Sequence, residues 1–125
     1  MKTFALLLLT CLTCFGQTEV TLGLDCRFLA SSAATGNDDN ESTASYTPRI
    51  GAELIAIVVN TKAATPDQPT AVGNCLTWTE LFDTNFLADH RLTVWYAKCG
   101  SGACAGAFTA ATSGISQTGW AVGVF

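Results

Sequence analysis

Near the middle of the chain stands the run ELIAIVV, residues 53–59. The residues that follow Glu53 are all apolar, and most of them are β-branched. β-branched residues favour strands, and a strand that is apolar on both faces is typical of one covered on both sides. The run therefore predicts a central strand, covered on both faces, around which the domain is built.

Shorter segments on both sides of this run alternate apolar and polar residues, with the period of two that marks a half-buried strand. In residues 76–82 the alternation places Leu76, Trp78 and Phe82 on one face, and residues 91–98 alternate in the same way. Further strands are predicted at residues 18–24, 103–112 and 120–125, with a strand end near Tyr46 and a polar loop over residues 31–45. Short strands separated by Gly, Asn and Pro turns predict an antiparallel β-sandwich, Ig-like or jelly-roll-like, with about seven strands and no helix after residue 16.

Length and composition limit the classes of protein to consider. The chain has 125 residues, of which 49% are hydrophobic and 13% charged, with 10 acidic against 6 basic side chains. This length fits one domain, and the apolar content excludes a disordered tail. The net charge of −4 and the lack of a basic cluster argue against a nucleic-acid partner.

The amino terminus has the layout of a secretory signal peptide. Met1-Lys2 is a short positive region, residues 4–12 are almost wholly apolar, and Cys14 and Gly16 are small residues at −3 and −1 from a cut before Gln17. A membrane-spanning helix needs about 20 apolar residues, and this run is shorter. A lipoprotein signal is a further alternative, although Thr precedes both Cys11 and Cys14. We therefore expect an exported protein with no stable membrane insertion, in which residues 1–16 are removed and residues 17–125 form the domain.

The chain stops at an apolar strand, residues 120–125, with no polar tail. An apolar strand at the edge of a sheet would promote aggregation, so it must be paired on both sides or belong to a longer protein. We favour the second alternative and expect a domain that is incomplete at its carboxyl end.

Four cysteines remain in the mature chain, Cys26, Cys75, Cys99 and Cys104. An even number of cysteines in an exported chain favours disulfides. If residues 100–103 form a four-residue hairpin loop, Cys99 lies opposite Cys104 at a distance that a disulfide tolerates, and Cys26 pairs with Cys75 by elimination. Free thiols and a tetrathiolate zinc site are the alternatives, but only one close cysteine pair is present.

Catalytic machinery is sparse in the sequence. His90 is the only histidine and reads as a solvated turn residue, and the phosphate-cradling, dinucleotide and Gly-x-Ser-x-Gly patterns are absent. Glu53 and Glu80 are the only carboxylates considered for a glycosidase pair. The interpretation is a protein that is not an enzyme, with no catalytic residue and no cofactor.

Two groups of residues are candidates for binding. Asp38, Asp39 and Glu41 lie in the polar stretch and offer oxygen ligands to calcium, although the EF-hand order is absent and no metal is expected. Trp95 and Tyr96 point to opposite faces of their strand, so one of them faces outward and is a candidate platform for a sugar ring.

Three phrases in order carry a resemblance to known proteins: YTP…GxxLI in residues 46–55, LTWT in residues 76–79 and RLTVWYA in residues 91–97. Over residues 28–125 the chain resembles a β-sandwich module of uncharacterised secreted bacterial proteins and of phage tail or host-recognition proteins. The resemblance implies an extracellular, adhesive or structural context and assigns no functional residues. It also implies further strands after the one that matches residues 120–125.

The expected function is therefore that of a non-enzymatic extracellular β-sandwich module for surface attachment, assembly or recognition, with another surface protein or a glycan as its partner. The alternative is a carbohydrate-binding module that uses Trp95 or Tyr96. A fragment of a polysaccharide hydrolase is a third interpretation.

Overall fold

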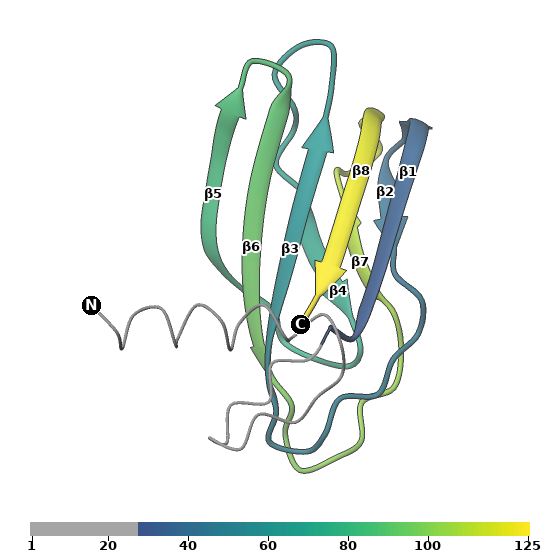
Figure 1. The fold of residues 1–125 in the computed structure, drawn as a ribbon, viewed down its shortest axis with the longest axis vertical. Coiled ribbons are helices and arrows are strands. Elements are labelled where there is room, and N and C mark those ends of the chain that lie inside the picture. Colours follow the sequence, from purple (N-terminus) through teal and green to yellow (C-terminus); the bar gives the residue numbers. More distant parts are fainter. Residues whose placement is uncertain (1–27) are drawn as a thin grey trace, which may run out of the picture.

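The computed structural model of the protein describes residues 28–125 (Figure 1). The predicted signal peptide (residues 1–16), the predicted strand at residues 18–24 and Cys26 lie outside the described residues.

Eight strands form two antiparallel sheets that pack face to face (Figure 1). The larger sheet has five strands in the order β1-β8-β3-β6-β5, and the smaller sheet has three in the order β2-β7-β4. The strand bounds are β1 Ala30–Asp38, β2 Asn40–Ser42, β3 Glu53–Thr61, β4 Thr70–Gly73, β5 Thr79–Leu87, β6 His90–Lys98, β7 Phe108–Ala111 and β8 Gln117–Val124. The prediction of an all-β antiparallel sandwich is confirmed.

β3 is the middle strand of the larger sheet, as the run at residues 53–59 predicts, and it pairs with β8 and β6. Its alternate residues Leu54, Ala56 and Val58 face the smaller sheet and are at most 2% exposed. The prediction that both faces are covered is wrong, because Ile57 on the other face is 38% exposed. The smaller sheet covers only the inner face of the larger one.

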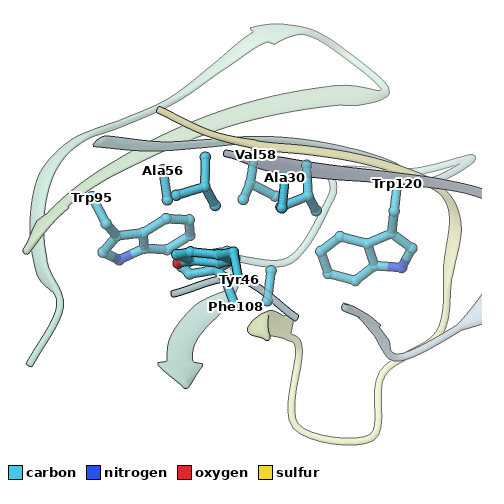
Figure 2. Close-up of a cluster of buried hydrophobic side chains, with 10 residues drawn as sticks. Ala30, Tyr46, Ala56, Val58, Trp95, Phe108 and Trp120 are labelled. Carbon is cyan, nitrogen blue, oxygen red and sulfur yellow. The ribbon is translucent and has the colours of Figure 1, made fainter. Parts of the chain in front are cut away.

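The core lies between the sheets and is built around Phe108 of β7 (Figure 2). Its ring meets Trp78 edge to face, with centroids 4.8 Å apart, and lies 5.9 Å from the ring of Trp95. Figure 2 shows Trp95 and Trp120 at opposite ends of the cluster, with Tyr46 and Phe108 between them. Burial raises the pKa of Tyr46 to about 12.

The polar stretch at residues 31–45 was predicted as a loop, and this prediction is wrong. Residues 30–35 pair with β8, and residues 40–42 pair with β7. The physical reason lies in contacts with distant strands. Small side chains allow residues 30–35 to lie beside β8, and the pairing satisfies the hydrogen bonds of their backbone, which local composition does not reveal. As a consequence β8 is paired on both sides, by β1 and β3.

The predicted hairpin that joins residues 99 and 104 is not formed. β6 belongs to the larger sheet and β7 to the smaller one, so residues 99–107 cross from one layer to the other. Trp95 of β6 and Phe108 of β7 therefore meet across the core, with ring centroids 5.9 Å apart.

The disulfide pairing changes for the same reason. Cys104 on the crossing segment is bonded to Cys75, with Cα atoms 5.6 Å apart, whereas Cys99 at the end of β6 is a buried free thiol. Asn74 and Cys75 adopt left-handed backbone conformations after β4, with φ of 56° and 45°, and this turn presents Cys75 to the crossing segment. The predicted Cys99–Cys104 bond is therefore wrong, and with Cys75 bonded elsewhere the predicted Cys26–Cys75 bond is excluded as well.

Candidate functional site

The carboxylates considered for glycosidic chemistry lie on opposite faces of the larger sheet. Glu53 begins β3 on the outer face, where its carboxylate is 3.6 Å from Lys98 Nζ. Glu80 on β5 lies opposite Trp95 in the register with β6 and therefore belongs to the inner side. A glycosidase needs two carboxyl groups within about 10 Å that flank one sugar, and residues on opposite faces of a sheet do not provide that arrangement.

His90 lies on the exposed turn between β5 and β6. Its Nδ1 is 2.7 Å from Asp89 Oδ1, and this hydrogen bond lowers the pKa of Asp89. The arrangement is a local pair on the surface at the start of β6.

The three residues considered for calcium lie around the tight turn between β1 and β2 but have separate partners. Asp39 Oδ1 accepts a hydrogen bond from Asn40 Nδ2 at 2.7 Å, and the Glu41 carboxylate accepts one from the Ser32 hydroxyl. Asp38 ends β1, and its backbone oxygen accepts a hydrogen bond from Trp120 Nε1. Within residues 28–125 no three acidic, His or Cys side chains are grouped in a way that could hold a metal ion.

The two aromatic candidates face opposite sides of the larger sheet, as their alternation predicts. Trp95 is 3% exposed and its ring fills the core, so it offers no face to a sugar, and its assignment as a ligand platform is wrong. Tyr96 is half-buried on the outer face, in register with Ile55 and Thr79.

The middle of the outer face of the larger sheet is uncharged, and it is apolar over β8, β3 and β6. The strand registers align its side chains in three rows. The rows are Ser31–Gly123–Ile57–Val94–Phe82, Ala33–Ala121–Val59–Leu92–Thr84 and Phe125–Ile55–Tyr96–Thr79. None of these residues is charged, and we call this surface the outer face.

The outer face has two unlike halves. Over β1 and β8 its residues are small, and a groove of about 440 Å³ runs there between Ile57, Val59 and Phe125. Over β6 and β5 its residues are large, and Phe82 is 51% exposed. Within residues 28–125 the three rows carry no charged side chain, and the Glu53–Lys98 pair stands at the rim, at one end of β3.

A second hollow of about 480 Å³ opens between the two sheets, where β4 lies nearest to β5. Trp78, which is half-buried, contributes aromatic surface to it, and Trp95 reaches it only with the 3% of its surface that is exposed. The rim of the hollow carries Gln68 and Glu80, whose side chains are joined by a 2.9 Å hydrogen bond. Trp78 is fixed at this site because its Nε1 donates to Gly73 O at 3.3 Å. We call this hollow the inter-sheet cleft.

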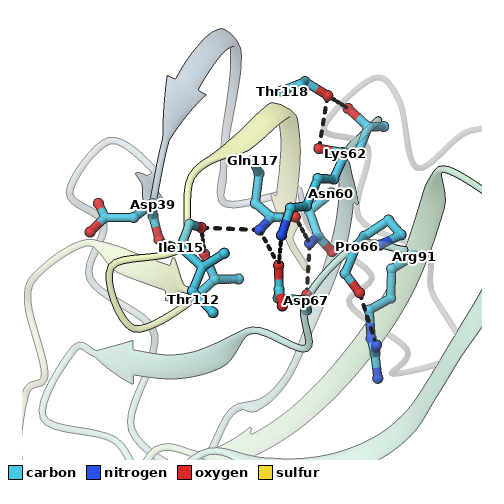
Figure 3. A network of polar contacts seen from close by, with 11 residues as sticks. Asp39, Asn60, Lys62, Pro66, Asp67, Arg91, Thr112, Ile115, Gln117 and Thr118 are labelled. Atoms are coloured by element: carbon cyan, nitrogen blue, oxygen red, sulfur yellow. Dashed lines mark hydrogen bonds and ion pairs between the residues drawn. The ribbon is translucent and has the colours of Figure 1, made fainter. Parts of the chain in front are cut away.

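A polar cluster beyond one end of the cleft holds the segment between β3 and β4 in place (Figure 3). Asn60 Nδ2 donates to Asp67 O and to Gln117 Oε1, both at 2.9 Å, and Gln117 Nε2 donates to Asp67 Oδ2 at 3.0 Å. Lys62 Nζ lies 2.6 Å from the same carboxylate oxygen. Hydrogen bonds from Lys62 and Gln117 lower the pKa of Asp67, so it stays ionised within the cluster.

Arg91 extends this cluster toward β5. Its Nη1 donates to Pro66 O at 3.1 Å, and its guanidinium forms a two-point ion pair with Asp83. The buried Thr93 hydroxyl also donates to Asp83 Oδ1, at 2.7 Å. The hydrogen bonds from Arg91 and Thr93 hold the pKa of Asp83 below its ordinary value.

Of the outer face and the inter-sheet cleft, the sequence indicates only the outer face. A run that is apolar on both faces already implied an apolar outer face, although it was interpreted as covered. The sequence carries no comparable signal for the inter-sheet cleft, because Glu80 enters the predictions only as one carboxylate of a glycosidase pair. The cleft exists because the two sheets have different widths, and the alternation of apolar and polar residues in the sequence does not predict the width of a sheet.

Comparisons with protein-family models, with curated proteins and with solved structures return no match for this chain. Over the described range, 28–125, no helix is long and apolar enough to span a membrane. The findings establish an all-β domain of two antiparallel sheets, with a Cys75–Cys104 disulfide.

Proposed function

We propose that the chain is a non-enzymatic extracellular module for assembly, and that it associates with a second copy of itself through the outer face. The observation that carries the proposal is the outer face itself, with two uncharged rows across five strands, a third across four positions, and the Glu53–Lys98 pair at its rim. Interfaces share this anatomy, since their centres are depleted of charge and their rims are polar. The disulfide is consistent with an oxidising compartment.

The three rows set the size of the outer face. Five strands spaced about 4.8 Å apart, with rows about 6.6 Å apart, give a surface of roughly 480 Å². A stable interface of standard size buries about 800 Å² on each partner, so a dimer through these rows belongs to the smaller and weaker class of interfaces.

The two halves of the outer face favour a second copy as the partner. A two-fold axis that runs along the middle strand β3 sets the β1–β8 half of one copy against the β6–β5 half of the other. Leu92 of each copy then meets the groove over Ala121 of its partner, and Phe82 meets Ser31. The Phe125 ring lies over Gly123 and forms one wall of this groove. A two-fold interface needs one surface that offers both the projection and the recess, and the outer face offers both.

The test is the association state of two matched variants. Ile57→Lys places a charge in the central row, and Ile115→Lys makes the same change on the turn between β7 and β8, at similar exposure (38% and 44%). At about 100 µM, well above the micromolar affinity of a weak standard interface, light scattering should give a dimer for wild type and Ile115→Lys. Ile57→Lys should weaken the dimer by about thirty-fold or more, as at an interface hot spot. A monomeric wild type, or a dimer that Ile57→Lys leaves intact, would disprove the proposal.

The carbohydrate alternative has less support, because Trp95 is buried and Tyr96 is the one remaining aromatic candidate. A glycan array with wild type and Tyr96→Ala addresses it directly. Binding that depends on Tyr96 would favour a carbohydrate-binding module over the assembly role.

A further inference from the structure

The inter-sheet cleft holds one fixed aromatic side chain. Trp78 lines the cleft and is half-buried, so part of its indole is open to a ligand. Its Nε1 donates to Gly73 O at 3.3 Å, and its ring meets Phe108 edge to face with centroids 4.8 Å apart. Small-molecule sites have volumes of about 300–1,000 Å³. The cleft, at about 480 Å³, is large enough for one small ring beside this indole.

Two polar side chains form the rim of the cleft. Gln68 precedes β4 and Glu80 lies on β5, and Gln68 Nε2 donates to Glu80 Oε2 at 2.9 Å. Both side chains are exposed. A glutamine side chain has two N–H donors and an acceptor oxygen, and a carboxylate has two acceptor oxygens. The bond between them therefore leaves one N–H donor and the amide oxygen of Gln68, and one carboxylate oxygen of Glu80, for a ligand.

The backbone that carries Gln68 is held by the polar cluster beyond the end of the cleft (Figure 3). Asn60 Nδ2 donates to the carbonyl oxygen of Asp67, the residue directly before Gln68. Lys62 Nζ lies 2.6 Å from the carboxylate of the same aspartate. This segment is therefore fixed before a ligand arrives, and binding to a pre-formed site loses less conformational entropy.

The free edge of β4 adds main-chain groups to the same cleft. Phe108 of β7 is in register with Gly73 but exchanges hydrogen bonds with Thr43 on its other side. Alternate residues of an antiparallel strand bond to opposite sides, so Val72 bonds to β7 whereas the N–H and C=O of Ala71 point away from it. No other strand in the range 28–125 pairs with β4, and Ala71 lines the cleft. Its peptide groups supply one donor and one acceptor.

The chemistry of these groups favours a neutral ligand that is rich in hydroxyls. They include donors and acceptors, and a hydroxyl serves as both, whereas a cation would satisfy only the acceptors. The charge of Glu80 is already offset in part by Arg91, whose pKa is raised first by its hydrogen bonds to Asp83 and further by the charge of Glu80. A sugar ring has hydroxyls at its edge and apolar C–H groups on its faces, and such faces pack on aromatic rings.

We propose that the inter-sheet cleft binds one pyranose ring of a neutral glycan. The C–H groups of the ring pack against Trp78, and its hydroxyls bond to Gln68, Glu80 and the peptide groups of Ala71. The site lies on the inner side of the larger sheet, whereas Tyr96 and the proposed dimer interface lie on its outer face. The inference therefore holds or fails independently of the dimer.

The probes are methyl α-glucopyranoside and its galactose and mannose counterparts, each of which differs from the first in the orientation of one hydroxyl. A ligand of this size, with about 13 non-hydrogen atoms, is expected to bind with a dissociation constant near 1 mM. Each sugar is titrated to about 50 mM, well above that constant, into protein labelled with nitrogen-15. The amide signal of Ala71 and the indole N–H signal of Trp78 are followed by NMR. We expect at least one sugar to shift both signals along a saturating curve.

Matched variants locate the site. Gln68→Ala and Glu80→Gln change exposed side chains, so the core is kept, and each should weaken binding by about tenfold, as expected for the loss of a hydrogen bond to the ligand. Glu53→Gln makes the same change at an exposed carboxylate on the rim of the outer face and should leave the affinity unchanged. Ile57→Lys, which is designed to weaken the dimer, should bind the sugar as wild type does.

Three results would overturn the inference. The first is no shift of either signal with any of the sugars at the highest concentration. The second is binding that Gln68→Ala and Glu80→Gln leave unchanged. The third is a shift of the Trp78 signal by tetramethylammonium chloride where the sugars cause none, since this would make the cleft a site for organic cations.

Discussion

The two faces of β3 carry similar apolar residues and have opposite surroundings. Leu54, Ala56 and Val58 are at most 2% exposed beneath the smaller sheet, whereas Ile57, on the same strand, is 38% exposed. Burial of apolar surface stabilises a fold by about 25 cal/mol per Å², so the inner residues hold this domain together and the outer ones contribute little to its stability. The outer residues contribute less to folding than the inner ones, and we assign their remaining apolar surface to a partner.

The largest expected effect is a difference in the free energy of unfolding between alanine variants of two phenylalanines, Phe108 in the core and Phe82 on the outer face. Phe108→Ala removes a fully buried ring between Trp78 and Trp95 and should lower the free energy of unfolding by about 4 kcal/mol. Phe82→Ala removes a ring that is 51% exposed on the outer face and should cost less than about 1 kcal/mol. Urea denaturation of both variants measures the difference, and similar losses would mean that the outer face is covered within the folded chain.

The next effect concerns the link between the two layers. Cys75–Cys104 closes a loop with a sequence separation of 29 and ties the crossing segment to the turn after β4. Chain-entropy arguments give such a loop about 3.5 kcal/mol. The double variant Cys75→Ser, Cys104→Ser should lose roughly that much in thermal or urea unfolding, while its dimerisation at low temperature is retained. Thiol labelling with mapping of the modified residues provides the control, because buried Cys99 should be modified only after denaturation, and Cys75 and Cys104 only after reduction.

The core and the disulfide show which features of this fold could be predicted from the sequence and which could not. The strand at residues 53–59 and the all-β class follow from local pattern, because periodicity and β-branched residues are properties of a short segment. The disulfide could not be predicted, because it depends on residues 99–107 crossing between layers instead of turning back as a hairpin. The strands at residues 30–42 were missed because polar residues form a strand only when a neighbour such as β8 pairs with them. The inter-sheet cleft was missed because its existence depends on the relative widths of the sheets, a property of the assembled fold.

A smaller effect on the free energy of unfolding depends on pH. It tests the ion pair between Asp83 and Arg91. The hydrogen bonds from Arg91 and Thr93 lower the pKa of Asp83 from its ordinary value of 3.8. A carboxylate whose folded-state pKa is depressed stabilises the protein fully above its unfolded pKa, and this stabilisation is lost as the pH falls through 3.8 toward the folded value. Asp83→Asn should cost about 2 kcal/mol at pH 7, because it weakens charge-assisted hydrogen bonds to Arg91, and should flatten the decline in stability between about pH 5 and pH 2. A variant whose acid unfolding curve parallels that of wild type would show that this pair does not control the response.

The smallest effect on stability is the most direct comparison of the two faces, because it uses the same residue at adjacent positions of one strand. Val58 is fully buried, and Val58→Ala should cost about 2 kcal/mol through the lost methyl groups and the cavity left behind. Val59 lies on the outer face, where it lines the groove, and Val59→Ala should cost less than about 1 kcal/mol. The association measurements should give the reverse order, because only Val59 contributes to the dimer: Val59→Ala should weaken it several-fold, and Val58→Ala should leave it unchanged under conditions where the protein is folded. If both substitutions altered stability and association to the same extent, the two faces would not be separable, and the outer face would have to be regarded as part of the core of this domain.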